Sequence, residues 1–154
     1  MRDPILHWLT SLRTGTGLAR LVLAAIFLYA GFTKGLYPFE EPFLFAIAVS
    51  SYQLLPEWAV IFVSRALPWL EIALGLVLLV GWKLRYVAAF TALLLTAFMV
   101  AMGITYARGI EADCGCFGFG EPISPLTLAR DSLFLGLAFY LAVSAWRAPS
   151  VRTG

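Results

Sequence analysis

Residues 86–106, YVAAFTALLLTAFMVAMGITY, contain no charged side chain and are long enough to cross a bilayer as one helix. A helix rises about 1.5 Å per residue, so roughly 20 apolar residues cross a hydrocarbon core about 30 Å thick. Similar apolar runs occupy residues 18–36, 57–82 and 126–146. The sequence therefore predicts an all-α membrane protein, built as a four-transmembrane-helix bundle.

The composition supports this class. Of the 154 residues, 61% are hydrophobic and 13% are charged, whereas a soluble domain carries about 25% charged residues. No repeat or linker divides the chain, so residues 1–154 are predicted to form a single membrane domain. The net charge of +2 is too small for a nucleic-acid binding surface.

Two apolar segments are too short to span a membrane. Residues 42–51 are followed by polar residues and Pro56, so a short interfacial or re-entrant helix after the first span is expected, not a fifth span. The apolar residues of the segment 5–12 share one helical face, which predicts an amphipathic helix lying on the membrane. A cleaved signal peptide is the alternative, but its apolar region would start unusually late and lacks a convincing small-residue cleavage site, so a retained first span is expected. At the start of the last span, Ser124 and Pro125 are predicted as the N-cap and the first helical residue.

The basic residues predict the orientation, because cytoplasmic segments of membrane proteins are enriched in Lys and Arg. One end of the four-span bundle carries Arg2, Arg13, Arg20, Lys83, Arg85, Arg147 and Arg152, and the other carries Lys34, Arg65, Arg108 and Arg130. Both termini are therefore predicted to be cytoplasmic, in a cytoplasmic membrane of the bacterial type. The loop 108–124 then faces outside, where disulfides form and persist.

This loop holds both cysteines of the chain, in the run DCGCFGFG at residues 113–120. Cysteines two residues apart can reach the separation that a disulfide requires, about 4.4–6.8 Å between Cα atoms. A structural staple over three residues would remove little entropy from the unfolded chain, whereas a small strained ring is more easily reduced. Cys114 and Cys116 are therefore predicted to be a catalytic thiol–disulfide pair.

Metal binding is an alternative for the same two residues, because soft thiolates bind ions such as Cu(I) and Zn(II). Met99 and Met102 precede the loop on the third span. The single histidine, His7, is predicted at the opposite face of the membrane. A metal-binding or metal-transfer protein with Cys114 and Cys116 as ligands is therefore kept as the second hypothesis.

Charged residues inside spans are energetically costly and often functional. Lys34, Glu71, Arg130 and Asp131 all fall in the outer half of the predicted bundle, beneath or beside the cysteine loop. One interpretation is structural, an ion pair of Glu71 with Lys34 or Arg130. The other is a polar pocket that carries protons or orients a quinone or a partner, since thiol oxidation releases protons together with electrons.

Several short motifs follow one another in a recognisable order. They are Gly31-Phe32-Thr33-Lys34, the YQLLP turn at 52–56, LPWLE at 67–71, CGCFG at 114–118, and Arg130 at the start of the last span. Over residues 18–147 the chain resembles the methylamine-utilisation MauE branch of the DoxX-like membrane proteins. The resemblance implies a four-helix membrane redox protein that acts in disulfide maturation of exported proteins, with an exported thioredoxin-like partner. By position it implies Cys114 and Cys116 as the redox pair, and Lys34, Glu71 and Arg130 as a buried polar set.

One departure separates this chain from better understood membrane disulfide proteins. The disulfide-bond-forming and vitamin K epoxide reductase-like proteins use two cysteine pairs, one for the partner and one beside a quinone, whereas this chain has one pair. Either the pair serves both steps, or electrons pass without a quinone, or the partner supplies the second pair. The predicted function is thiol–disulfide exchange with an exported thioredoxin-like protein, with a quinone as candidate cofactor. A non-catalytic assembly factor for an exported protein is the third hypothesis.

Overall fold

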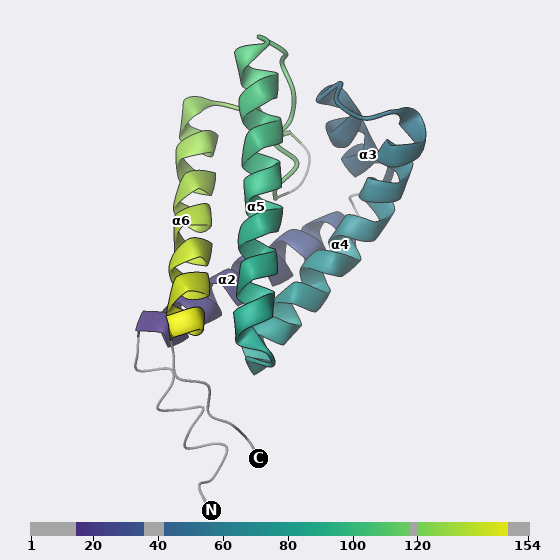
Figure 1. The fold of residues 1–154 in the computed structure, drawn as a ribbon. Coiled ribbons are helices and arrows are strands. Elements are labelled where there is room, and N and C mark those ends of the chain that lie inside the picture. The colour runs from purple at the N-terminus through teal and green to yellow at the C-terminus, as the bar shows by residue number, and fades with distance from the viewer. Residues whose placement is uncertain (1–14, 36–41, 118–119, 148–154) are drawn as a thin grey trace, which may run out of the picture.

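A computed structural model describes residues 15–35, 42–117 and 120–147 of the chain. Its helices are α2 (Gly15–Gly35), α3 (Pro42–Ser51), α4 (Glu57–Val80), α5 (Leu84–Ala107) and α6 (Pro125–Arg147) (Figure 1). Of these, α2, α4, α5 and α6 are long and apolar enough to cross a membrane. The predicted all-α four-span bundle is confirmed, and the predicted helix at 42–51 is α3. The predicted N-terminal amphipathic helix and Leu36 lie outside the described residues.

The helix ends follow from local chemistry. The Ser124 side chain accepts a hydrogen bond from the backbone N–H of Thr127 at 3.2 Å, and Pro125 is the first residue of α6, as predicted. Helix α4 ends at Val80 and is capped by Gly81, which has a φ of 79° and donates its N–H to the carbonyl of Val77. A left-handed residue at this position is a common helix stop, and it allows the tight turn into α5.

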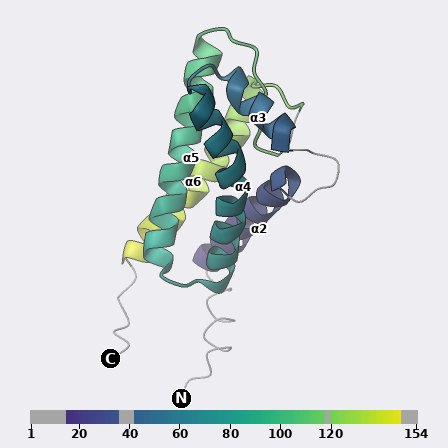
Figure 2. The same cartoon turned by 90° about the vertical axis from the view of Figure 1, so that its right-hand side faces the viewer.

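The helices form two pairs that diverge toward one end of the molecule. Helix α2 packs against α4, and α5 packs against α6. Near the α4–α5 turn the four helices share a core that includes Leu23, Leu78, Ala88 and Leu141. At the other end α4 leans away from α5 (Figures 1 and 2), and α3 packs against α4 there. The cysteine loop lies at this open end, opposite the start of α2 and the end of α6.

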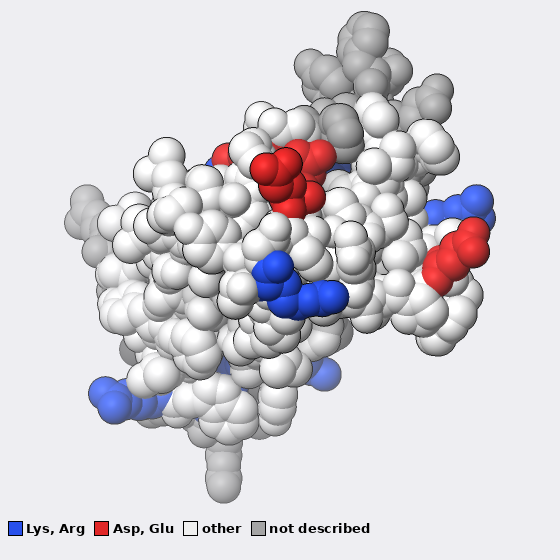
Figure 3. Space-filling model, turned by 90° about the horizontal axis from the view of Figure 1, so that it is seen from above, with Lys and Arg blue, Asp and Glu red and all other residues white. Residues whose placement is uncertain are grey.

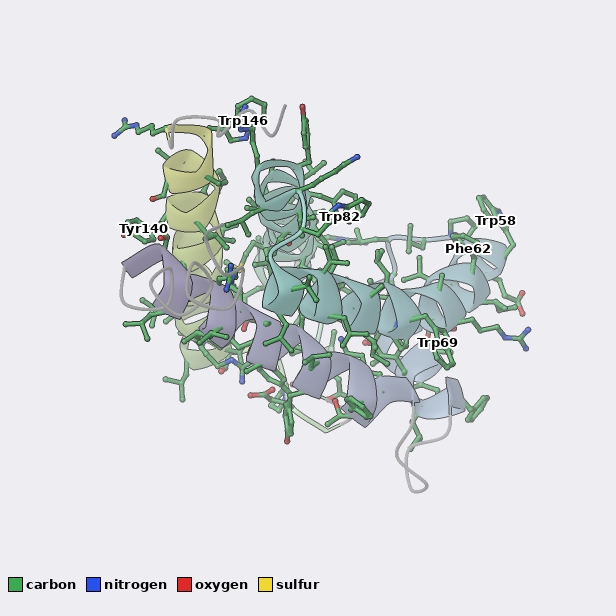
Figure 4. The ribbon with its side chains drawn as sticks, turned by 90° about the horizontal axis from the view of Figure 1, so that it is seen from below. Trp58, Phe62, Trp69, Trp82, Tyr140 and Trp146 are labelled. Atoms are coloured by element: carbon green, nitrogen blue, oxygen red, sulfur yellow. The ribbon has the colours of Figure 1, made fainter. Side chains whose placement is uncertain are left out.

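The outer surface is largely apolar. Seen from the loop end, only a few charged side chains interrupt a mostly uncharged face (Figure 3). On α4, Trp58, Phe62 and Trp69 are 74%, 68% and 62% exposed and point away from the bundle (Figure 4). Exposed aromatic side chains of this size are unfavourable in water, so lipid is their expected environment. Trp82 and Trp146 lie at the end opposite the cysteine loop, in the position of interfacial anchors.

Candidate functional site

The cysteine loop is held by backbone pairing across its base. The N–H of Cys114 donates to the carbonyl of Glu121 at 2.6 Å, and the N–H of Ile123 donates to the carbonyl of Ala112 at 2.9 Å. These bonds bring the two arms of the loop together in the manner of a short hairpin. The pairing fixes Cys114 at the mouth of the bundle, between α5 and α6.

The glycine between the cysteines is required by two features of the structure. Gly115 has a φ of 67°, a left-handed conformation that residues with a side chain rarely adopt. A Cβ atom at this position would lie 3.3 Å from the Phe45 ring and 3.4 Å from the Cβ of Ala48, both on α3. Helix α3 is therefore the surface on which the Cys-Gly-Cys turn rests.

The two sulfur atoms share one carboxylate. Asp131, near the start of α6, places Oδ2 at 3.6 Å from the Sγ of Cys114 and at 3.3 Å from the Sγ of Cys116. Both cysteines are free thiols, and each can donate a hydrogen bond to this oxygen. The Sδ of Met102 lies 3.5 Å from the Sγ of Cys114. The two thiols and the carboxylate lie within 4.8 Å of one another, so the same set could also hold a soft metal ion.

Arg130 ties the loop to helix α6. Its Nε donates to Oδ1 of Asp131 at 3.0 Å, and its Nη1 donates to Oε1 of Glu121 at 2.5 Å. The guanidinium lies over the ring of Phe117, 4.7 Å from its centroid. Arg130 therefore orients Asp131 so that the other carboxylate oxygen faces the sulfurs.

Phe117 covers the site next to Cys116. Its ring packs against Tyr29 of α2, at 5.6 Å between centroids, and against Phe134 of α6, at 6.1 Å. Beneath this cover Cys114 is 2% exposed, whereas Cys116 is only partly buried. The two thiols thus differ in how easily another molecule can reach them.

The environment of Cys116 disfavours its thiolate form. A hydrogen bond with the Cys114 thiol, burial, and the negative charge of Asp131 together raise the pKa of Cys116. The side chain of Tyr52 donates to the carbonyl oxygen of Cys114 at 2.7 Å, and burial is the main cause that raises the pKa of Tyr52. Because the thiolate is the reactive form of cysteine, this site needs a base, and the Asp131 carboxylate is in contact with both thiols.

A small cavity lies beside the thiols, within the bundle. Its volume is about 50 Å³, and its polar lining consists of Lys34, Glu71, Asp131 and Cys116. The Nζ of Lys34 lies 2.7 Å from Oε1 of Glu71, and the two side chains are 1% and 6% exposed. The remaining lining is apolar or thioether side chains from α2, α5 and α6 and the ring of Phe117.

Four of the predicted site residues line this cavity, namely Lys34, Glu71, Cys116 and Asp131, while Cys114 and Arg130 contact Asp131 beside it; the charged residues form two separate ion-pair groups. Glu71 pairs with Lys34, one of the two partners expected for it, while Arg130 pairs with Glu121 and Asp131. The sequence alone did not indicate that Glu121 or Tyr52 belongs to the site. Tyr52 lies in the YQLLP motif, which is the one signal that could have drawn attention to it.

Comparison with known proteins identifies the family. The sequence model of the family described as Methylamine utilisation protein MauE matches residues 7–144. The chain belongs to the MauE family. This match covers the cysteine loop, the Lys34–Glu71 pair and Arg130, so the resemblance drawn from the motifs is confirmed.

Three relatives carry the name Methylamine utilization protein MauE. The protein of Paracoccus denitrificans is 34% identical over 126 residues, covering 80% of this chain and 66% of its own length. That of Methylorubrum extorquens is 40% identical over 104 residues (66% and 54%), and that of Methylophilus methylotrophus is 35% identical over 98 residues (56% and 51%). This MauE-family chain therefore spans about half to two thirds of the length of the curated relatives it matches. No solved structure gives a significant match.

Proposed function

We propose that this MauE-family protein is a membrane thiol–disulfide oxidoreductase that exchanges electrons with an exported thioredoxin-like protein through Cys114 and Cys116. The observation that carries the proposal is the single carboxylate oxygen of Asp131 in contact with both sulfurs. A structural disulfide has no use for such a base. A pair of thiols that must lose and regain protons does, because both sulfurs take turns as nucleophile and leaving group.

The proposed reaction balances at this site. Asp131 accepts the proton of the attacking thiol, and the thiolate attacks a sulfur of the partner's disulfide, giving a mixed disulfide and a partner thiolate. Asp131 releases the first proton to water and accepts the proton of the second cysteine, which attacks the mixed disulfide, so that the Cys114–Cys116 bond forms and the second partner sulfur leaves. Two electrons pass to the partner, whose two thiolates take up protons from water. The same steps in reverse oxidise a reduced partner.

Burial assigns different roles to the cysteines in this proposal. Cys114 is 2% exposed and lies against Met102 and Tyr52, while Cys116 is the less buried thiol. A partner protein therefore reaches Cys116 first, once Phe117 moves aside. Cys116 forms the mixed disulfide in this scheme, and Cys114 resolves it.

The proposed orientation places this site outside the cytoplasmic membrane, with both termini cytoplasmic. Support comes from Arg20, Lys83, Arg85 and Arg147, which lie at the end of the bundle opposite the cysteine loop. The relatives are named methylamine utilization proteins, and we extend that role to this chain. The exported partner would then belong to the same system.

The test uses the full chain in lipid nanodiscs and a purified thioredoxin-like protein that lacks its resolving cysteine and whose remaining cysteine is activated as a mixed disulfide with 2-nitro-5-thiobenzoate, the leaving group that an attacking thiolate displaces. We expect the oxidised parent to contain no free thiol and to yield two per chain after mild dithiol reduction. Cys114→Ser should trap a stable mixed disulfide through Cys116, whereas the matched variant Cys116→Ser should trap at least tenfold less.

Two results would contradict the proposal. Failure of both single-cysteine variants to form a mixed disulfide would remove the redox function. Stoichiometric metal in gently purified protein, lost together with function in Cys114→Ser, would instead favour the metal-binding hypothesis. Trapping through Cys114 alone would leave the redox function in place and reverse the roles of the two cysteines.

A further inference from the structure

Glu71 and Asp131 both line the cavity, and each is paired with a cation. Oδ1 of Asp131 accepts a hydrogen bond from Arg130 at 3.0 Å, and Oδ2 faces the sulfurs. Oε1 of Glu71 accepts a hydrogen bond from Lys34 at 2.7 Å, while Oε2 is buried and has no hydrogen-bond partner among the described residues. Each carboxylate is thus anchored by a cation through one oxygen, and its second oxygen is left for another ligand.

The size of the cavity indicates what that ligand is. A buried carboxylate oxygen without a partner is unfavourable, so such atoms are normally satisfied by protein or by ordered water. Glu71 shares the cavity of about 50 Å³ with Asp131 and Cys116. One water molecule needs roughly 10–15 Å³ measured in this way, whereas cavities that take up benzene are about 150 Å³. The cavity therefore has room for a few water molecules beside the two carboxylates.

The two thiols lose their protons one after the other, and a second acceptor would leave Asp131 free for the second proton. Formation of one disulfide from two thiols releases two protons, but the oxygen of Asp131 that faces the sulfurs can take only one at a time. We infer that Glu71 is a proton acceptor for the dithiol, which receives the first proton from Asp131 through water in the cavity. This inference rests on the proposed function.

Proton transfer from Asp131 to Glu71 accounts for both steps of the reaction. When Cys116 is deprotonated, the electron pair of its S–H bond stays on sulfur and the proton goes to Asp131. Transfer of that proton to Glu71 returns Asp131 to its charged form, in time to take the proton of Cys114 as the Cys114–Cys116 bond closes. Both carboxylates afterwards release their protons to water.

The charged and titratable groups around Glu71 suit this role. Lys34 of α2 pairs with Glu71, and Cys116 of the loop and Asp131 of α6 line the same cavity, to which α5 contributes only apolar and thioether side chains. Lys34 also lies over the ring of Phe45, with its Nζ 5.1 Å from the centroid. This contact stabilises the ammonium group while Glu71 carries a proton.

The test separates the two chemical steps by rapid mixing of the reduced full-length chain with a small disulfide such as oxidised glutathione. Acid quenching followed by mass spectrometry distinguishes free thiols, the mixed disulfide and the closed Cys114–Cys116 ring. The informative variant is Lys34→Met combined with Glu71→Gln, which removes both charges and leaves no buried charge without a partner. Glu57→Gln, the same change at an exposed carboxylate on α4, is the matched control.

We expect the double variant to form the mixed disulfide at the parental rate but to close the ring at least ~10-fold more slowly, within the range of lost acid–base catalysis. The mixed disulfide should then accumulate, and raising the pH should restore closure because hydroxide replaces the missing acceptor. A purely structural pair would not slow one step selectively. If the folded double variant closes the ring as fast as the parent, the inference is wrong while the proposed function stands. If the parent never forms the Cys114–Cys116 bond, both fail.

Discussion

Removing Lys34 or Glu71 alone should destabilise the protein strongly, whereas removing both charges should not. The Nζ and Oε1 atoms are 2.7 Å apart and both side chains are almost fully buried. At an effective dielectric constant of 20, Coulomb attraction at this separation is about 6 kcal/mol, which offsets the desolvation of the two charges. Removing one partner leaves the other charge uncompensated. We therefore expect Lys34→Met or Glu71→Gln alone to lower the free energy of unfolding by about 3–5 kcal/mol.

The comparison that decides this is between the two single variants and the double variant Lys34→Met with Glu71→Gln. With both charges gone, no buried ion remains, so its loss of stability should be far smaller than the sum of the two single losses. Unfolding in mixed micelles with rising denaturing detergent, followed by helical circular dichroism, measures all four states of the cycle. Glu57→Gln should change the free energy of unfolding by no more than about 0.5 kcal/mol. Single losses below about 1 kcal/mol that simply add would refute the pairing argument.

Three further outcomes are expected. Gly115→Ala should lower the free energy of unfolding by about 1 kcal/mol or more, measured in the same micelle assay, since Gly115 has a φ of 67° and lies against Phe45; an unchanged value would contradict the described turn. Burial and the negative charge of Asp131 also raise the pKa of Cys116, and both remain in Cys114→Ser. Alkylation of Cys116 in that variant should therefore keep increasing with pH after an exposed cysteine, with a pKa of about 8.5, has levelled off; a plateau at the same pH as the exposed cysteine would count against the buried environment. A membrane-impermeant thiol reagent should label the reduced loop in intact cells, and labelling only in opened cells would reverse the proposed orientation.

The spans could be predicted from the sequence because their signal is local. An uncharged run such as residues 86–106 has one stable arrangement in a bilayer, and α5 differs from that prediction by no more than two residues at either end. The start of α6 could also be predicted, since Ser124 and Pro125 are residue types that favour a helix N-terminus. These features depend on neighbouring residues alone.

The site could be predicted only as a set of residues, because its geometry depends on contacts between distant segments. Whether Glu71 pairs with Lys34 or Arg130 depends on how α2 and α4 cross, which no helical periodicity reveals. The bond from Tyr52 to the carbonyl of Cys114 joins residues 62 positions apart. The direction of the pKa shift of Cys116 likewise follows from burial and from the position of Asp131, and charges counted along the sequence do not predict it.

The central claim is that Cys114 and Cys116 form a reversible redox couple. Its most direct measurement is a titration of the full chain in nanodiscs against defined redox buffers, with thiols trapped by alkylation at each potential. We predict that both thiols disappear together as a two-electron couple, with a slope of about 30 mV per tenfold change in the ratio of oxidised to reduced protein. The midpoint should lie above about −300 mV, because structural disulfides lie below that potential. Thiols that stay free across all buffers, or a bond that resists reduction well below that potential, would contradict the account.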